Sequence, residues 1–172
     1  MSPRLKAEAA GTFGLVFLGT GACVVDAVSG GSLGSAGVGL VFGLAVWAMA
    51  SVFGAQMNPA ASLALCLRGR QPWRDLPPLA GVQLLGAFAA SFALKLTFGA
   101  RGGNLGSTLP HAGVGLAFGA ELLMTFLLLY AVLKTPAARG PVVAGVVVGL
   151  EAAFGGPASG ASMNPARSIG PA

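Results

Sequence analysis

The chain has 172 residues, of which 55% are hydrophobic and only 9% are charged, and its net charge is +5. Ten basic and five acidic side chains are too few to cover the surface of a water-soluble globule of this size. The composition therefore argues against a soluble domain, a disordered chain and a nucleic-acid binder, and it indicates a membrane protein. Two cysteines in apolar stretches are interpreted as buried thiols, and with a single histidine we expect no metal and no cofactor.

Five apolar stretches are long enough to cross a bilayer as helices, which takes about 20 residues. In chain order they are residues 7–28, 36–55, 77–98, 113–133 and 138–156. The first is interpreted as a retained span, because its apolar run is longer than the core of a cleaved signal peptide. Seven of the ten basic residues fall on the side of the N-terminus, which predicts that the N-terminus is cytoplasmic.

A helix-start signal interrupts the uncharged segment after the second stretch. Asparagine is a favoured N-cap and proline is favoured at the first helical position, so Asn58-Pro59-Ala60 predicts a new helix over Pro59–Leu67. That helix is too short to cross the membrane. We expect it to dip in and return to the cytoplasmic side, where Arg68 follows.

The same triplet returns as Asn164-Pro165-Ala166, inside a seven-residue segment that matches the first at six positions. Glu121 lies in the fourth stretch as Glu8 lies in the first, so each unit has a glutamate-bearing span, a second span and a half-helix. The predicted fold is an all-α membrane protein with one domain over residues 1–172. It is an inverted repeat, with repeat one over about 1–98 and an incomplete repeat two over about 113–172.

Two half-helices that meet near the midplane would direct unpaired N–H groups and positive dipole ends at one point. The side-chain amides of Asn58 and Asn164 can donate hydrogen bonds there as well. This arrangement favours a neutral polar solute and repels cations and protons.

Carboxylates inside membrane spans are costly and usually functional. Glu8 and Glu121 could relay protons or could anchor the re-entrant loops, and their symmetric placement favours anchoring. Glu151 has no counterpart in the first repeat, and its role stays open. Three glycine pairs at the spacing of close helix crossings complete the pattern; they are Gly39/Gly43, Gly115/Gly119 and Gly145/Gly149.

With these motifs the sequence resembles the aquaporin and glycerol-facilitator family, the major intrinsic proteins. The resemblance is carried by both Asn-Pro-Ala motifs, the Gly-Ala before each, Ala7-Glu8, Gln83-Leu84-Leu85-Gly86-Ala87 and Arg167-Ser168. It implies a passive channel rather than an enzyme, in the plasma membrane, assembled as a homotetramer. Gln56 departs from the family's usual histidine.

The resemblance also implies an outer selectivity filter of four residues. Counting back from the two asparagines, and one step past the second motif, places it at Val38, Ala152, Ala161 and Arg167. The resemblance implies a filter that is wider and less polar than the filter of strict water channels. It is similar to the filters of glycerol facilitators and plant nodulin-like proteins. The expected permeants are water, glycerol, urea and undissociated metalloid hydroxides.

Three other functions are compatible with parts of the sequence. The chain stops six residues after the second motif, so we expect the sixth span to be missing, and a truncated, non-conducting membrane remnant is the main alternative. A proton-coupled transporter would use the three membrane glutamates. An intramembrane serine protease is disfavoured because the single histidine, His111, lies in a loop.

Overall fold

The structure is a computed structural model that describes all of residues 1–172, and every regular element in it is helical. Five helices are long and apolar enough to cross a membrane: α1 (Pro3–Val28), α2 (Gly34–Phe53), α4 (Leu76–Phe98), α5 (Val114–Lys134) and α6 (Gly140–Ser159). Two short helices, α3 (Pro59–Leu67) and α7 (Pro165–Ile169), follow α2 and α6. Short 3-10 turns cover Trp73–Asp75, Gly99–Gly102 and Ala137–Arg139. The five predicted spans are confirmed.

The helix ends follow local signals that hydropathy does not contain. α1 begins at Pro3 because Ser2 caps it, with the Ser2 hydroxyl accepting a hydrogen bond from the backbone N–H of Leu5. α6 runs to Ser159, past the apolar stretch, and ends at Gly160, whose left-handed backbone is the usual helix stop. Both spans are therefore about three or four residues longer at these ends than the apolar pattern predicted.

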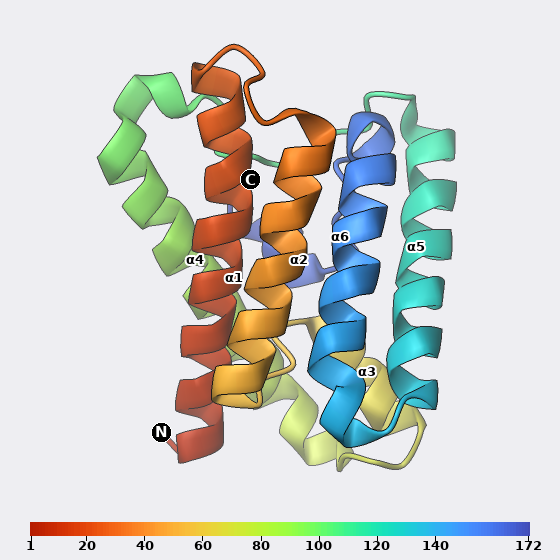
Figure 1. Ribbon diagram of the computed structural model, residues 1–172. Helices are drawn as coiled ribbons and strands as arrows, with labels where there is room; N and C mark the ends of the chain where they lie inside the picture. Colours follow the sequence, from red (N-terminus) through yellow and green to blue (C-terminus); the bar gives the residue numbers. More distant parts are fainter.

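The long helices alternate in direction and form a bundle around the short ones (Figure 1). α1, α2, α6 and α5 stand side by side in the view, and α4 lies behind α1. α3 lies at the end of the bundle that holds the N-terminus, while α7 comes from the opposite end. α2 packs against α6 and α1 against α4, as the two closest helix pairs of the bundle. The arrangement is the predicted inverted repeat.

Glycines allow α2 and α6 to touch through their backbones. A Cβ atom added to Gly39 would lie 2.6 Å from the carbonyl oxygen of Gly149, and one added to Gly145 would lie 2.6 Å from that of Gly43. These two glycine pairs form the predicted close crossing. On α5 that prediction is wrong within this chain, because a Cβ atom on Gly115 or Gly119 would have no neighbour within 4 Å.

Large apolar side chains cover the outside of the bundle. Phe118 on α5 is 70% exposed and Phe154 on α6 is 88% exposed. A water-soluble protein rarely presents so continuous an apolar surface, whereas a lipid bilayer solvates it. The polar groups of the re-entrant loops lie inside instead, where the rest of the chain satisfies their hydrogen bonds.

Candidate functional site

Each half-helix begins at the asparagine that the sequence singled out. The Asn58 Oδ1 accepts a hydrogen bond of 2.9 Å from the backbone N–H of Ala60, and Pro59 opens α3. The Asn164 Oδ1 accepts bonds from the backbone N–H groups of Ala166, at 3.0 Å, and Arg167, at 3.3 Å. The side-chain oxygen therefore serves as the cap, which leaves the amide nitrogen of each asparagine to face elsewhere.

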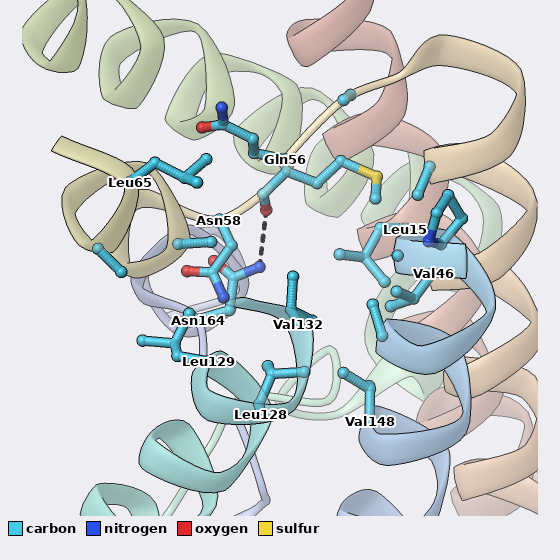
Figure 2. Close-up of a pocket in the computed structure, with 18 of the residues that line it drawn as sticks. Leu15, Val46, Gln56, Asn58, Leu65, Leu128, Leu129, Val132, Val148 and Asn164 are labelled. Atoms are coloured by element: carbon cyan, nitrogen blue, oxygen red, sulfur yellow. Dashed lines mark hydrogen bonds between the residues drawn. The ribbon is translucent and has the colours of Figure 1, made fainter. Parts of the chain in front are cut away.

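Those amide nitrogens join the two repeats. The Nδ2 of Asn58 donates to the carbonyl oxygen of Met163 at 2.8 Å, and the Nδ2 of Asn164 donates to that of Met57 at 2.7 Å. Figure 2 shows the second of these bonds as a dashed line. An amide NH₂ group has two N–H bonds, so each asparagine keeps one donor for a further partner. Sequence analysis did not find this reciprocal pair, because it depends on how two distant loops meet.

The residue before each asparagine has a strained backbone. Met57 has φ of 56° and Met163 has φ of 53°, in the left-handed region that residues other than glycine seldom adopt. This turn presents the methionine carbonyl to the opposite asparagine. Strain of about 1–3 kcal/mol persists only where surrounding contacts enforce it.

Glu8 on α1 supplies such contacts to the first loop, and it is only 2% exposed. Its Oε1 accepts a bond from the backbone N–H of Gln56, and its Oε2 accepts one from the backbone N–H of Met57, both at 2.8 Å. Gln83 on α4 adds a third bond of 2.9 Å to Oε2. Both oxygens of this carboxylate are therefore engaged.

Glu121 on α5 repeats the pattern at the second loop. It accepts bonds of 2.8 Å from the backbone N–H groups of Ser162 and Met163, one at each oxygen. The Ser159 hydroxyl, at the end of α6, adds a bond of 2.7 Å to Oε1, the oxygen that also accepts from Ser162. Glu151 is different, since its Oε2 is buried without a hydrogen-bond partner.

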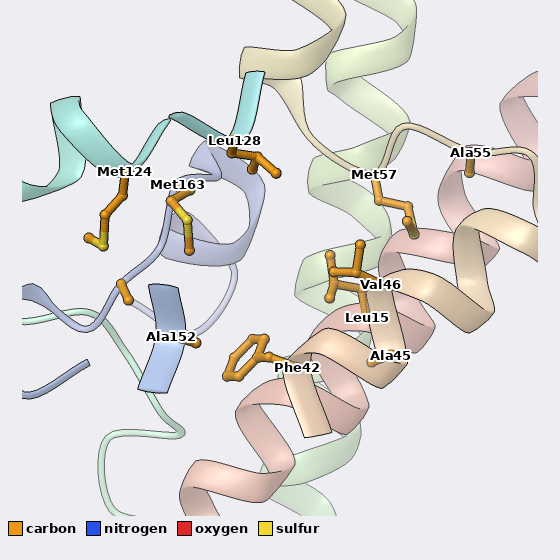
Figure 3. Close-up of a cluster of buried hydrophobic side chains, with 11 residues drawn as sticks. Leu15, Phe42, Ala45, Val46, Ala55, Met57, Met124, Leu128, Ala152 and Met163 are labelled. Carbon is orange, nitrogen blue, oxygen red and sulfur yellow. The ribbon is translucent and has the colours of Figure 1, made fainter. Parts of the chain in front are cut away.

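The four residues expected at the filter lie in or beside the buried apolar cluster that contains Phe42. Ala152 and Ala161 belong to a buried apolar cluster with Phe42, and Val38 packs against this cluster. In Figure 3 Ala152 and Phe42 lie next to each other in the middle of the cluster. The guanidinium of Arg167 lies over the Phe42 ring, with its carbon 5.1 Å from the ring centre.

Arg167 is itself 3% exposed and is held from the loop between α4 and α5. Its Nη1 donates a bond of 2.7 Å to the carbonyl oxygen of Gly106, while its Nε has no partner. Gly106 has φ of +72°, which favours glycine at this turn. Neither Gly106 nor Phe42 was a sequence candidate, because a loop glycine and a span phenylalanine have no distinctive spacing.

A cavity of about 480 Å³ extends from the two half-helix asparagines to Arg167 and Phe42. Asn58, Asn164 and Arg167 line it together with mostly apolar side chains of both repeats. Figure 2 shows the two asparagines among these apolar side chains. It reaches Arg70 and Thr135, at the end of the bundle that holds the N-terminus. An apolar wall with a few converging donors is suited to small, neutral, polar molecules. No group of three or more His, Cys, Asp or Glu side chains could hold a metal ion.

The fold and the site define a class of membrane protein: an inverted-repeat helical bundle in which two half-helices meet inside a membrane-embedded cavity. Residues 2–172 match the family model described as "Major intrinsic protein", and the chain belongs to this family. Members of this family are membrane channels and not enzymes. The chain is accordingly an integral membrane protein.

The chain is similar to plant aquaporins in sequence and to an aquaglyceroporin in structure. The chain is 40% identical to Aquaporin NIP1-1 of Zea mays, over 98% of this chain and 64% of that protein. It is 42% identical to Aquaporin NIP1-4 of Oryza sativa subsp. japonica, over 98% and 65%. The chain thus spans less than two thirds of the length of these curated relatives. The solved aquaglyceroporin from Plasmodium falciparum superposes with a TM-score of 0.85 at 28% identity, covering 98% of this chain and 78% of that one.

Proposed function

We propose that this protein is a passive channel for water and small neutral solutes, with glycerol, urea and undissociated metalloid hydroxides as the solute class. The observation that carries the proposal is the reciprocal bonding of Asn58 and Asn164, which holds two half-helix N-termini at one cavity. Each asparagine retains one N–H donor for an acceptor oxygen of a passing molecule.

The positive charges along the cavity favour a neutral permeant over a cation. The N-termini of α3 and α7 bring positive dipole ends to the cavity, and Arg167 adds a full positive charge on the same path. A cation or a hopping proton meets repulsion at both points, whereas a neutral hydroxyl or carbonyl oxygen gains hydrogen bonds.

Small side chains explain why solutes larger than water belong to the proposed class. Val38, Ala152 and Ala161 carry small side chains at the cluster that contains Phe42, and Arg167 is the single strong donor among the four. The similarity to an aquaglyceroporin, by the name of that protein, supports glycerol as a permeant. In this proposal the four residues act together as the selectivity filter.

Glu8 and Glu121 are proposed to anchor the two loops. The same backbone contacts occur at both carboxylates, and every carboxylate oxygen is engaged. A proton-coupled transporter would need a carboxylate that gains and releases protons along the path, and these contacts favour the anchoring role.

Membrane placement and assembly form part of the same proposal. Most basic residues lie on the side of the N-terminus, which supports a cytoplasmic N-terminus. Family resemblance supports the plasma membrane as the location. Residues 1–98 form the first repeat and residues 113–172 belong to the second. Family resemblance supports a homotetramer.

Stopped-flow light scattering on proteoliposomes tests the proposal. Vesicles with the whole chain are expected to equilibrate water, glycerol and urea faster than protein-free vesicles, with no effect of a protonophore. Water flux without glycerol or urea flux would overturn the solute assignment. Flux no faster than in protein-free vesicles would overturn channel function and favour a non-conducting remnant.

A further inference from the structure

Gln71 is a buried polar residue with no part in the function proposed so far. It lies in the loop after α3 and is 5% exposed. Its Oε1 accepts a hydrogen bond of 2.8 Å from the Nε2 of Gln56 and another from a guanidinium nitrogen of Arg4. Its Nε2 donates to the carbonyl oxygen of Ser62 and to the sulfur of Cys66, each at 3.4 Å. Both ends of the Gln71 amide are therefore engaged.

Gln56, which donates to that oxygen, borders the proposed solute path. It lines the cavity two residues before Asn58. Its Nε2 is bonded to Gln71, and its Oε1 accepts a hydrogen bond from the buried Ser62 hydroxyl on α3. Figure 2 shows that the Gln56 amide points away from the amides of Asn58 and Asn164. Both ends of the Gln56 amide are thus held against α3 and the loop that follows it.

Arg4 fixes which way the Gln71 amide is turned. A guanidinium group can only donate hydrogen bonds, so the Gln71 atom that faces Arg4 is the oxygen. The same oxygen then faces Gln56, which has to present its nitrogen in turn. Arg4 lies in the first turn of α1 and also forms an ion pair of 2.8 Å with Asp75. A chain of hydrogen bonds therefore runs from this ion pair to an amide that lines the cavity.

The bond to Gln71 is the one hydrogen bond that the Gln56 nitrogen makes. An enclosed amide nitrogen without an acceptor is unfavourable, so a Gln56 amide that loses this bond gains by turning into the cavity, where water or a solute can accept from it. In that position the amide narrows the path and binds passing oxygen atoms. The Gln71 oxygen therefore determines whether the Gln56 amide faces the wall or the path.

We propose that Gln71 is a positioning residue of the pore: its oxygen holds the Gln56 amide out of the solute path on the α3 side of the cavity. This inference rests on the proposed channel function. It assigns a part in solute passage to a loop that lies outside the two half-helices and outside the four filter residues. Gln71 acts through Gln56 and does not itself contact the solute.

The first test is the glycerol permeability of proteoliposomes that contain the whole chain. Gln71→Leu removes the oxygen at similar size and is expected to lower this permeability about threefold, with a smaller effect on water, because the freed amide enters the path. Gln71→Glu keeps an acceptor for Gln56 and Arg4 and is expected to retain the permeability of the original chain. Cys66→Ser alters a contact of the Gln71 nitrogen instead, and this matched control is expected to change nothing. Unchanged permeability in Gln71→Leu, or an equal loss in Gln71→Glu, would overturn the proposal.

A second comparison separates positioning from folding. In Gln56→Ala there is no amide to turn into the cavity, so the addition of Gln71→Leu is expected to change glycerol permeability by less than about 1.5-fold. A folding defect caused by Gln71→Leu would lower the permeability in both backgrounds. A loss of the same size in the presence and in the absence of the Gln56 side chain would therefore overturn the positioning role.

Failure of the channel itself gives a different result. If vesicles with the original chain conduct no faster than protein-free vesicles, the proposed function is contradicted, and thermal unfolding in detergent then tests the contact between the two glutamines. Gln71→Leu is expected to lower the unfolding midpoint less in Gln56→Ala than in the original chain, because no amide nitrogen is left without an acceptor. Equal shifts in the two backgrounds would show that Gln71 does not hold Gln56 and would overturn this inference.

Discussion

Asn58 and Asn164 lie 106 residues apart in the sequence, and each donates a hydrogen bond to the carbonyl of the methionine that precedes the other. Each asparagine thus has two structural duties, since its oxygen caps its own half-helix and its nitrogen holds the opposite loop. The pair closes the inverted repeat at its centre, and the first prediction concerns these two duties.

Serine and alanine at position 58 separate the two duties. Asn58→Ser keeps a capping oxygen but lacks the amide that donates to Met163, and it is expected to destabilise the protein by about 1 kcal/mol. Asn58→Ala loses both interactions and is expected to cost about 2–3 kcal/mol. Thermal unfolding in detergent, followed by circular dichroism, measures the difference. Equal losses in the two variants would mean that the capping oxygen contributes nothing, and an unchanged stability of Asn58→Ser would mean that the bond between the loops contributes nothing.

The glutamates give a second prediction. Glu8→Gln places an amide donor opposite the backbone N–H of Gln56 or Met57, so one hydrogen bond to a charged acceptor is lost. The expected cost is about 1.5–3 kcal/mol. Glu121→Gln is expected to behave alike, because its contacts to Ser162 and Met163 are equivalent. Thermal unfolding of both variants checks this, with Asp75→Asn, which weakens a solvent-exposed ion pair to Arg4, as the control. Flux that is lost in stable, fully folded glutamine variants would instead support proton coupling.

The glycine pairs give a third prediction, with an internal control. Gly145→Ala forces a methyl group to 2.6 Å from the carbonyl oxygen of Gly43, and the helix separation that results is expected to cost about 1–3 kcal/mol. Gly119→Ala meets open space, and since alanine favours helices it is expected to be neutral or stabilising by up to about 1 kcal/mol. The thermal unfolding midpoints of Gly145→Ala, Gly119→Ala and the original chain test this prediction. Similar destabilisation by both substitutions would contradict the packing described for α2 and α6.

The width of the filter gives a fourth prediction. Ala152→Phe adds a ring beside Phe42 and is expected to reduce glycerol flux about tenfold, equivalent to about 1.4 kcal/mol of barrier, with a smaller effect on water. Leu150→Phe adds a similar ring to the lipid-facing side of the same helix, where Leu150 is 67% exposed, and is the control. Glycerol and water permeabilities measured on the same vesicles test this. A glycerol flux that is unchanged by Ala152→Phe would place the narrow point elsewhere.

Local patterns in the sequence predicted much of this architecture. Hydropathy predicted five spans, and the Asn-Pro signal predicted helices that start at Pro59 and Pro165, where α3 and α7 begin. These features depend on residues close together in the chain, so periodicity and capping rules apply to them directly. The symmetric glutamates were found through the repeat, and their contacts with the two loops were anticipated as one of two readings.

The surroundings of Arg167 were beyond such rules. Phe42 and Gly106 come from two separate segments, and nothing in their spacing relates them to Arg167. Gly115 and Gly119 on α5 are the reverse case, in which the sequence predicted a contact that this chain does not make. A glycine pair allows a close crossing only where another helix backbone faces it. Both cases depend on tertiary packing, which the local sequence does not encode.

The measurement that tests the account most directly is the glycerol permeability of proteoliposomes that contain the whole chain, compared with protein-free vesicles and with the Asn58→Ala variant. The account predicts glycerol equilibration well above that of protein-free vesicles, insensitive to a protonophore and reduced in Asn58→Ala. Glycerol equilibration at the rate of protein-free vesicles would contradict the central claim that the two half-helices form a pore for neutral solutes.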